Sequence, residues 1–442
     1  MRQTVPLADL HSHLWGTITA DDYLDFVLET QGPREWETYE DYYEQVYGTR
    51  PSIEGVVVRA GEGNLSARRE FRQLYVFGEK DAGDFPRFQA KMNVTTSGRP
   101  RSQRGPDSEV HFARKSMATQ VSQGVRYAEQ RNLFSRLSSI EAEQVIISIL
   151  NTFGQAPEGF RTRLAVSLDR ADPWLLWDAV QNAALGPLGH VLTGIDFCFF
   201  EEGFPPAEKR EFFDAVNDFN ERHPERALAI LYHVGESFPD KSLESAVRWV
   251  HEAADLGAHR LGHAISLGID PALYGAHQRT EPVSERIAQL EYDLSHAEGL
   301  VRHGVRIDKS GTRSELEALR RHPQDDFVTL EYDDDRLEEV RRRQDYAMKR
   351  IRALNVVVEV CPTSNRRIGG MTDASQHPVL RFIENDLPFV VSTDDPGIFD
   401  VTLAEEIEWV VEAADLGSGA FEEIASRSWR YRGEVITGRE KE

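Results

Sequence analysis

The feature that most constrains this chain is the alternation of short, β-branched apolar runs with longer helical patterns. Apolar runs bounded by turn residues are typical of buried strands, whereas apolar residues spaced by three and four indicate helices. Alternating strand and helix units form parallel sheets, and eight such units close into a barrel. The fold class we expect is therefore α/β, a (β/α)8 TIM barrel. Its strands are predicted near residues 5–13, 124–131, 161–169, 190–198, 227–235, 259–264, 355–362 and 388–395.

Two connections are too long for simple barrel loops, and we predict insertions at about 30–85 and 269–335, with helical content of their own. Long insertions in compact domains are usually lids, binding loops or mobile segments. The acidic and aromatic stretch 36–47 either forms the core of its insertion or contributes a wall to a substrate site. We expect residues 1–442 to form a single barrel domain that carries both insertions.

Charge and cysteine content exclude several classes of function. The formal net charge is −23, which disfavours binding to nucleic acid or to anionic membranes, because basic patches supply that affinity. A small anionic ligand in a local basic pocket stays possible. Cys198 and Cys361 form no C-x-x-C pair, so a thiolate zinc site or a disulfide framework is not expected. Without a recognisable signal peptide or a run of about 18 apolar residues, a cytoplasmic location is expected.

Polar side chains interrupt the apolar pattern where four predicted strands end. Catalytic groups of (β/α)8 barrels lie at these carboxyl ends. His11 and His13 point to the same side of the first strand, since alternate strand residues share a face. A lone histidine or an Asp-Asp-Pro turn is usually structural, but all of these exceptions together indicate a site. The others are His233 and Glu236 after the fifth strand, His263 after the sixth, and Asp394 and Asp395 after the eighth.

This set of side chains suits one metal ion. Three histidines and one carboxylate are typical ligands of zinc, which keeps an open position for water in catalytic sites. Zinc lowers the pKa of that water to about 7. His263 and Glu236 are the remaining titratable groups for moving protons. Asp395 diverges from its neighbour Asp394 and is free to contact substrate.

Five motifs in order along the chain make the comparison specific. HSHLWG, HVGES, RLGHA, CPTSN and STDDP together resemble the adenosine deaminase family of metal-dependent amidohydrolases, with weaker matches at GVRYAEQR and HPVLRF. The resemblance runs from residue 7 to about 410 and leaves both insertions unmatched. It implies one Zn²⁺ per chain, or another divalent metal in its place. The metal ligands that it implies are His11, His13, His233 and Asp394.

The same resemblance implies the catalytic roles. Glu236 matches the proton donor to the ring nitrogen beside the attacked carbon. His263 matches the residue that handles the water proton, and Asp395 matches the residue that hydrogen-bonds the purine and the attacking hydroxyl. Because Glu236 must be protonated to donate, we expect burial to raise its pKa.

Three departures from the family pattern concern substrate binding. Trp15 stands where the family usually has an acidic residue, and indole donates a hydrogen bond but accepts none. It either stacks on a substrate ring, closes off space, or packs under the insertion. If Asp196 aligns with the family's D-L-A-G-D-E-like turn, Phe199 replaces a glycine there, unless the alignment slips toward Gly203. Arg366 and Arg367 after CPTSN either bind an anionic substrate group or face solvent.

The sequence leaves three functions to compare. The first is a zinc-dependent hydrolytic deaminase that releases ammonia from adenosine or an adenine-like amino-heterocycle. The second is another zinc amidohydrolase, which cleaves an amide or ester. The third is a non-catalytic barrel that binds a ligand. The family-like positions of Glu236 and Asp395 favour the first, with a small-molecule substrate and neither nucleic acid nor membrane as partner.

Overall fold

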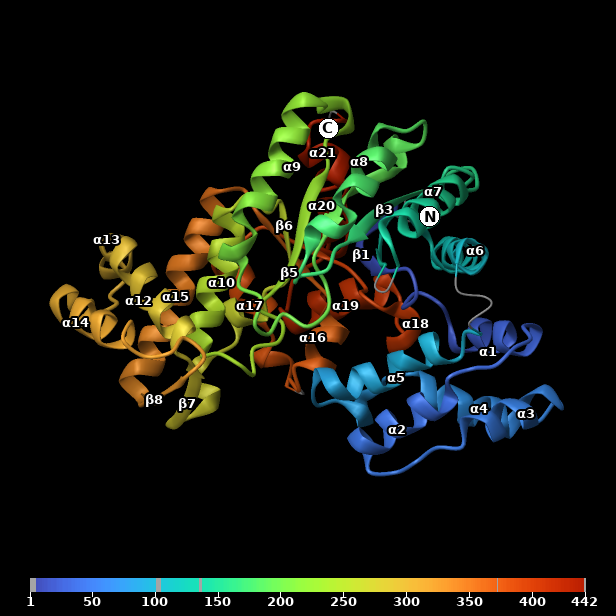
Figure 1. The fold of residues 1–442 in the computed structure, drawn as a ribbon, viewed down its shortest axis with the longest axis horizontal. Helices are drawn as coiled ribbons and strands as arrows, with labels where there is room; N and C mark the ends of the chain where they lie inside the picture. The colour runs from blue at the N-terminus through green and yellow to red at the C-terminus, as the bar shows by residue number, and fades with distance from the viewer. Residues whose placement is uncertain (1–4, 101–104, 135–136, 372, 441–442) are drawn as a thin grey trace.

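A computed structural model describes residues 5–100, 105–134, 137–371 and 373–440. Its main sheet has eight parallel strands, and the (β/α)8 barrel predicted from the sequence is confirmed (Figure 1). The sheet closes where Ser12 of the first strand bridges to Asp394, just beyond the last. In spatial order the strands are β1 (Leu7–His13), β2 (Val125–Leu133), β3 (Arg161–Ser167), β4 (Leu192–Asp196), β5 (Ala229–Val234), β6 (Arg260–His263), β9 (Val357–Val360) and β10 (Phe389–Val391).

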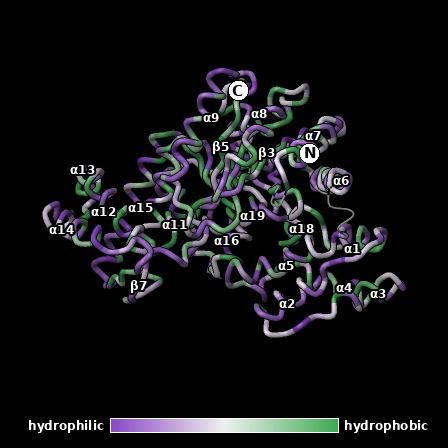
Figure 2. The backbone as a smooth tube through the Cα atoms, in the orientation of Figure 1, coloured by the Kyte–Doolittle hydropathy of each residue, from purple (hydrophilic) through white to green (hydrophobic). Residues whose placement is uncertain are grey.

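The barrel strands are buried on both faces, which explains their continuous apolar runs. Every residue of β5, β6 and β9 is buried. One side of each strand faces the barrel interior, and the other packs against the helical layer. Figure 2 shows hydrophobic residues gathered along these central strands, while α14 at the periphery is largely hydrophilic.

Amphipathic helices cover the outside of the barrel (Figure 1). Helix α10 places Ala246, Val247 and Val250 in the core, as its spacing predicts. Ser138 caps α7 reciprocally with Glu141, a capping box that satisfies free amides of the first turn. The layer comprises α6 (Pro106–Ser122), α7 (Ser139–Phe153), α8 (Trp177–Leu185), α9 (Arg210–Arg222), α10 (Leu243–Asp255), α15 (Asp334–Ala353), α17 (Pro378–Glu384), α19 (Leu403–Ala413) and α20 (Ala420–Arg430). Short helices α11 (Ile265–Gly268), α16 (Pro362–Ile368), α18 (Pro396–Phe399) and α21 (Gly433–Ile436) follow strands or close the chain.

The first insertion is helical and has its own hydrophobic core. After α1 (Ala20–Glu29) come α2 (Trp36–Tyr47), α3 (Ile53–Gly61), α4 (Leu65–Tyr75) and α5 (Phe85–Ser97). Tyr39 of α2 is fully buried in this core, and the rings of Tyr43 and Tyr47 stack with centroids 4.5 Å apart. The aromatic stretch thus serves the packing of the insertion.

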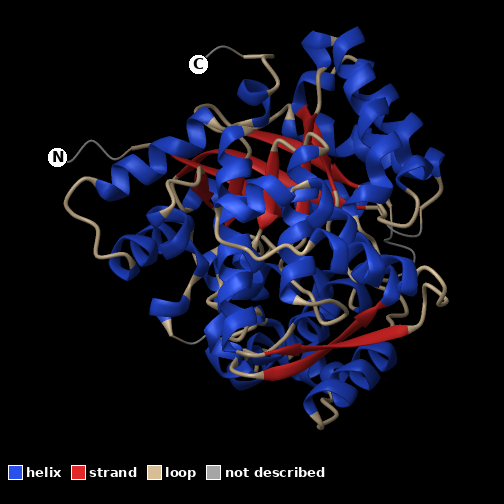
Figure 3. Cartoon of the chain, turned by 90° about the vertical axis from the view of Figure 1, so that its left-hand side faces the viewer, coloured by secondary structure: helices blue, strands red, loops and turns tan. Residues whose placement is uncertain are grey.

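The second insertion combines a small sheet with three helices. Strands β7 (His277–Pro282) and β8 (Phe327–Tyr332) pair antiparallel, and Figure 3 shows them apart from the barrel sheet. Between them lie α12 (Val283–Ser295), α13 (Ala297–Arg302) and α14 (Lys309–Leu319). Among the helices of the described ranges, none combines the length and the apolar character that crossing a membrane requires.

Candidate metal centre and active site

The structure brings the seven polar residues predicted at strand ends to one end of the barrel. His11 and His13 lie at the end of β1, His233 is the last but one residue of β5, and His263 is the last residue of β6. The imidazole rings of His11 and His233 lie 4.6 Å apart between centroids, and those of His11 and His263 lie 5.0 Å apart. Asp394 follows β10 and contacts both imidazoles of β1.

Four of these side chains form a group that fits a single metal ion. His11, His13, His233 and Asp394 each offer one ligand atom, and the four atoms lie within 4.8 Å of one another. Nε2 of His11 and Nε2 of His233 are buried and have no hydrogen-bond partner among the described residues. Buried polar atoms are rarely left unpaired without reason. Three imidazole nitrogens and one carboxylate oxygen are the donor set that zinc prefers.

Two buried carboxylates orient the imidazoles, and neither was identified as functional from the sequence. Glu359 of β9 lies 2.9 Å from Nδ1 of His11, and Asp196 of β4 lies 3.0 Å from Nδ1 of His233. A proton on each Nδ1 leaves Nε2 free to bind a metal, the usual arrangement of metal-binding histidines. Arg131 and Arg260 both contact Glu359 and hold its pKa well below the usual range, although burial opposes this.

The backbone around the site is strained, and a glycine is required. His263 and Asp394 adopt left-handed backbone angles, with φ of 65° and 63°. Such angles are uncommon outside glycine and concentrate at functional sites. A Cβ atom on Gly262 would lie 3.1 Å from Cγ of His233 and 3.2 Å from Cε1 of His11. The missing side chain therefore makes room for two imidazoles.

Glu236 faces His263 across the site. Oε1 of Glu236 lies 3.5 Å from Nε2 of His263, whose Nδ1 lies 2.8 Å from Oδ1 of Asn365. The turn that carries Glu236 is held from behind by Glu201, which accepts the backbone amides of residues 235, 236 and 237 at 2.9, 2.9 and 2.6 Å. Burial, together with the nearby carboxylates of Asp394 and Glu201, raises the pKa of Glu236 to about 7. This is the direction predicted from the sequence.

Adjacent Asp394 and Asp395 differ in ionisation. The imidazoles of His11 and His13 hold the pKa of Asp394 well below its usual range, although burial opposes this. Burial and the neighbouring carboxylate of Asp394 raise the pKa of Asp395 well above its usual range. Oδ1 of Asp395 is buried without a hydrogen-bond partner among the described residues, and it occupies the space that a Cβ atom on Gly16 would need.

Trp15 is bound on two sides by the protein itself. Its indole N–H donates to Oε2 of Glu109 at 3.0 Å, and the Arg99 guanidinium lies 4.3 Å from the ring centroid. The ring also packs against Phe112 of α6, with centroids 4.1 Å apart. This geometry accords with the interpretation that Trp15 packs inside the protein. A contact between Trp15 and substrate stays a prediction.

Phe199 and Arg366 also point to protein partners. Phe199 has a left-handed φ of 73°, a backbone conformation that favours glycine, and its half-exposed ring packs on Phe200. Arg366 lies over the Trp409 ring at 4.9 Å and pairs with Glu79 at 3.2 Å. Arg366 thus links α16 to the first insertion. A contact between Arg366 and an anionic substrate group stays a prediction.

A cleft of about 630 Å³ opens onto the site at Glu236. Its size falls within the range of small-molecule sites. Both insertions contribute to its walls: residues 84–86 come from the first, and Tyr274 and Arg279 come from the second. The apolar part of the lining consists of Phe85, Pro86, Phe200, Phe238, Pro239, Ile265, Ile269 and Ile368.

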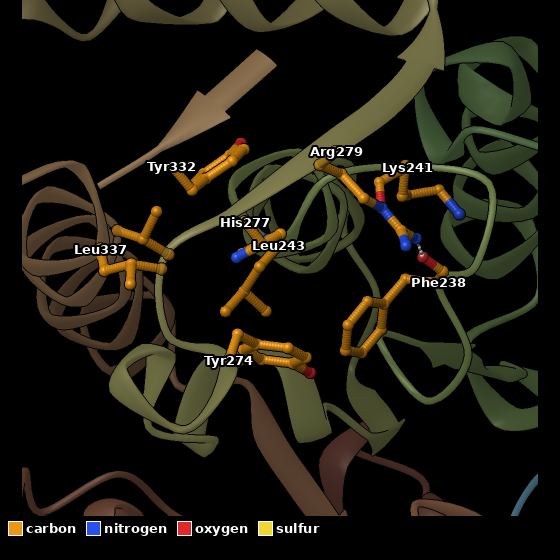
Figure 4. A pocket seen from close by; sticks show the side chains of 9 residues that line it. Phe238, Lys241, Leu243, Tyr274, His277, Arg279, Tyr332 and Leu337 are labelled. Atoms are coloured by element: carbon orange, nitrogen blue, oxygen red, sulfur yellow. Dashed lines mark hydrogen bonds between the residues drawn. The ribbon is translucent and has the colours of Figure 1, made fainter. Parts of the chain in front are cut away.

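A smaller cavity of about 90 Å³ lies beside the cleft, beneath the β7–β8 pair (Figure 4). It shares Phe238, Tyr274 and Arg279 with the cleft. Figure 4 shows Arg279 reaching from β7 toward the backbone of Phe238. The Arg279 guanidinium donates from Nη2 to the carbonyl oxygen of Phe238 at 2.6 Å and from Nε to that of Lys241 at 2.9 Å. Arg279 thus ties the second insertion to the loop that follows Glu236.

Comparisons with known proteins agree with this arrangement. The family model for adenosine deaminase matches residues 331–432, which include CPTSN, Asp394 and Asp395. An aminodeoxyfutalosine deaminase from Acidothermus cellulolyticus is 45% identical over 56 residues, which are 13% of this chain and 16% of that protein. The curated relatives that the chain matches align over 15 to 24% of their own length.

Solved structures are similar over nearly the whole chain. An adenine deaminase from Arthrobacter aurescens superposes with a TM-score of 0.54 at 17% identity, covering 99% of this chain and 98% of that one. An amidohydrolase from Burkholderia ambifaria with bound Zn superposes with a TM-score of 0.55 at 16% identity, covering 97% and 85%. At these identities the likeness concerns the fold.

The barrel gathers histidines and a carboxylate where its strands end. Over residues 331–432 the chain is similar to the adenosine deaminase family, and its fold is similar to that of solved deaminases.

Proposed function

We propose that this protein is a metal-dependent aminohydrolase that removes the exocyclic amino group of adenosine or another adenine-like heterocycle and releases ammonia. The observation that carries the proposal is the placement of Glu236 and His263 beside the His11, His13, His233 and Asp394 group, with Glu236 also lining the cleft. A cation-binding group alone would serve many hydrolyses. A buried carboxyl that is protonated near neutral pH, next to that group, suits proton transfer to a ring nitrogen.

The three nitrogens and the carboxylate of that group would hold zinc, with another divalent metal as an alternative. A bound zinc ion supplies Lewis acidity and lowers the pKa of a water molecule. Water adds to the ring carbon that bears the amino group, and that carbon exchanges nitrogen for oxygen. The products are the oxo-heterocycle and ammonia.

The remaining steps fall to side chains of this chain. Glu236, protonated because burial raises its pKa, donates from its carboxyl to the ring nitrogen beside the attacked carbon. His263, held by Asn365 at Nδ1, presents Nε2 to the water proton. Asp395, next to Asp394 and with its Oδ1 unpaired among the described residues, hydrogen-bonds the substrate and the attacking oxygen. Glu201 is a positioning residue, because it fixes the turn that aims Glu236.

The cleft favours an uncharged substrate over a phosphorylated one. Asp84, Glu202 and Glu236 are its acidic residues, and the only basic residue among its described lining is Arg279. Arg279 already directs two of its nitrogens to backbone carbonyls. Negative potential in a cleft disfavours an anionic ligand. We therefore propose a base or nucleoside as substrate, with aromatic and aliphatic walls that contact its apolar surfaces. We also propose that one barrel domain carries both insertions.

The test is ammonia release by zinc-loaded protein across bases, nucleosides, nucleotides and other amino-heterocycles. Nucleotides are included because an Arabidopsis protein of the same fold was solved in complex with GMP. Glu236→Gln should lose about 10²–10⁴-fold in kcat, the usual contribution of a general acid, and keep its metal. Glu225→Gln, on an exposed turn, is the matched control. Wild-type rates in Glu236→Gln would refute its role. Silence of the fully loaded protein across the panel would favour another amidohydrolase reaction or a ligand-binding barrel.

A further inference from the structure

A second cluster of metal-ligating side chains lies outside the barrel. His251 and Asp255 are four residues apart on α10, and His296 caps the carboxyl end of α12 in the second insertion. One ligand atom from each of the three lies within 4.8 Å of the others. Nε2 of His251 is 3.4 Å from Oδ2 of Asp255, and Nε2 of His296 is 4.0 Å from the same oxygen. None of these residues belongs to the centre described above.

Hydrogen bonds at Nδ1 turn both Nε2 atoms toward Asp255. Nδ1 of His296 lies 3.0 Å from the carbonyl oxygen of Tyr292 and 2.9 Å from the hydroxyl of Ser295. The carbonyl can only accept, so a hydrogen bond to it places the proton on this nitrogen. Nδ1 of His251 lies 2.7 Å from the hydroxyl of the same tyrosine, which can accept from it. A proton on Nδ1 leaves the Nε2 lone pair available. Metal-binding histidines are usually anchored in this way by a partner at the other nitrogen.

The buried histidine has an unsatisfied nitrogen. His251 is fully buried, and its Nε2 has no hydrogen-bond partner among the described residues although it points at Asp255. Its ring packs edge-on against Tyr292 and Tyr346. The side chains of Asp255 and His296 are 38% and 26% exposed, so the cluster opens to solvent on one side. Solvent can therefore supply further ligands to a cation bound there. Arg350, 3.9 Å from the other oxygen of Asp255, is the nearest competing cation.

We propose that His251, Asp255 and His296 form a second divalent-metal site that links α10 of the barrel to α12 of the second insertion. Two imidazole nitrogens and one carboxylate oxygen suit Zn²⁺, and also Ni²⁺ or Cu²⁺, whereas Mg²⁺ and Ca²⁺ prefer all-oxygen sites. Because α12 directly follows β7, a cation here fastens the insertion that contributes Tyr274 and Arg279 to the cleft. The site is structural, and it does not depend on the deaminase reaction.

The experiment counts metal ions bound to the full chain. Metal-free protein is dialysed to equilibrium against buffered free Zn²⁺, and bound zinc is measured per chain. We expect two equivalents for the wild type and one for each of His296→Gln, Asp255→Asn and Asp394→Asn. The combined His296→Gln and Asp394→Asn variant should bind none. His322→Gln, an exposed histidine in the same insertion, is the matched control and should bind two.

A second readout separates this site from the barrel centre. In the Asp394→Asn background, zinc should still raise the unfolding temperature, because a cation that binds only the folded state stabilises it. Adding His296→Gln should abolish that rise. Equal zinc content in the wild type, His296→Gln and Asp255→Asn would overturn the proposal, as would an unchanged zinc-induced rise in the combined variant. Loss of zinc from Asp394→Asn alone would report on the barrel centre and leave the second site intact.

Discussion

At the scale of single residues, the site depends on partners that hold each imidazole by the nitrogen not directed into the site. Glu359, Asp196 and Asn365 do this for His11, His233 and His263. These partners lie on β9, on β4 and in α16, so each contact crosses between elements that are distant in sequence. The affinity of the centre for a metal therefore depends on these partners as well as on the ligands. An imidazole that rotates freely loses more conformational entropy when it binds a metal.

Replacing Asp196 by asparagine tests this reasoning. Asparagine keeps the shape but is a weaker acceptor for Nδ1–H of His233, so we expect zinc affinity to fall about 10–100-fold. Competition titration against a chelator of known affinity measures the change. Asp214→Asn, an exposed residue of α9, is the control and should leave the Kd unchanged. An Asp196→Asn protein with wild-type zinc affinity would show that Asp196 does not orient His233.

Gly16 makes a prediction about Asp395. A Cβ atom at this position would lie 1.6 Å from Oδ1 of Asp395, so Gly16→Ala must displace that carboxyl. A misplacement of about 1 Å at a reacting group can cost about 10²-fold in rate. We expect kcat for ammonia release to fall by about that factor while zinc content stays at the wild-type level. Gly417→Ala, where nothing lies within 4 Å, is the matched control. Equal rates in both variants would remove Asp395 from the reaction.

At the scale of elements, the strands could be predicted from sequence because each is a short apolar run closed by polar residues. Strands β5 and β6 are an example. Their ends bring His233 and His263 to neighbouring register positions, because His233 pairs with Gly262, the residue before His263. The partners of those side chains could not be predicted. Glu201 looks like one of several acids after β4, and only the folded turn shows that it accepts three amides. Trp15 and Glu109 are 94 residues apart, so no local pattern reports their hydrogen bond.

The β5–β6 pair also predicts how stability changes with pH. Nδ1 of His259, just before β6, accepts the backbone amide of Ile230 at 3.0 Å, which requires an uncharged ring. Burial, helped by the Arg260 guanidinium, lowers the pKa of His259 to about 4. In the unfolded chain His259 binds a proton near pH 6.5. As the pH falls, the unfolded state is therefore protonated at His259 before the folded state is. The stabilising contribution is therefore complete above pH 6.5 and is lost as the pH falls toward 4.

Urea unfolding of the wild type and of His259→Asn at pH 7 and pH 5 measures this contribution. Asparagine preserves an acceptor for Ile230 but does not titrate. At about 1.4 kcal/mol for each pH unit below 6.5, the wild type should lose up to about 2 kcal/mol more than the variant between the two pH values. His322→Asn, exposed to solvent, should behave like the wild type. Identical pH dependence in His259→Asn and the wild type would contradict the assignment.

At the scale of the whole molecule, the cleft is made by parts of the chain that the sequence could place only as insertions. The barrel supplies Glu236, the first insertion supplies Phe85, and the second supplies Tyr274 and Arg279. Figure 1 shows the blue helices of the first insertion and the orange helices of the second on either side of the barrel. Their composition does not reveal that both reach the same site, because that depends on how each packs against the barrel.

Arg279 connects the second insertion to the loop of residues 236–241. Arg279→Gln removes the guanidinium donors to the carbonyls of Phe238 and Lys241. Each charge-assisted hydrogen bond contributes about 1.5–3 kcal/mol. Since about 1.4 kcal/mol corresponds to a factor of ten, we expect KM to rise at least about tenfold. Amide hydrogen exchange should become faster in residues 236–241. These residues follow β5 and include Glu236, the proposed proton donor, so a more mobile loop would also position Glu236 less well.

The matched control for this loop is Arg306→Gln. Arg306 lies in the same insertion, and its exposed side chain pairs with Glu339 and Asp335 of α15. It should change neither KM nor the exchange of residues 236–241. If Arg279→Gln left both at wild-type values, the second insertion would be independent of the loop of residues 236–241. If exchange became faster while KM stayed constant, the loop would be tied by Arg279 but would not contact substrate. KM and amide exchange together therefore decide whether the second insertion affects substrate binding or only lies beside the substrate site.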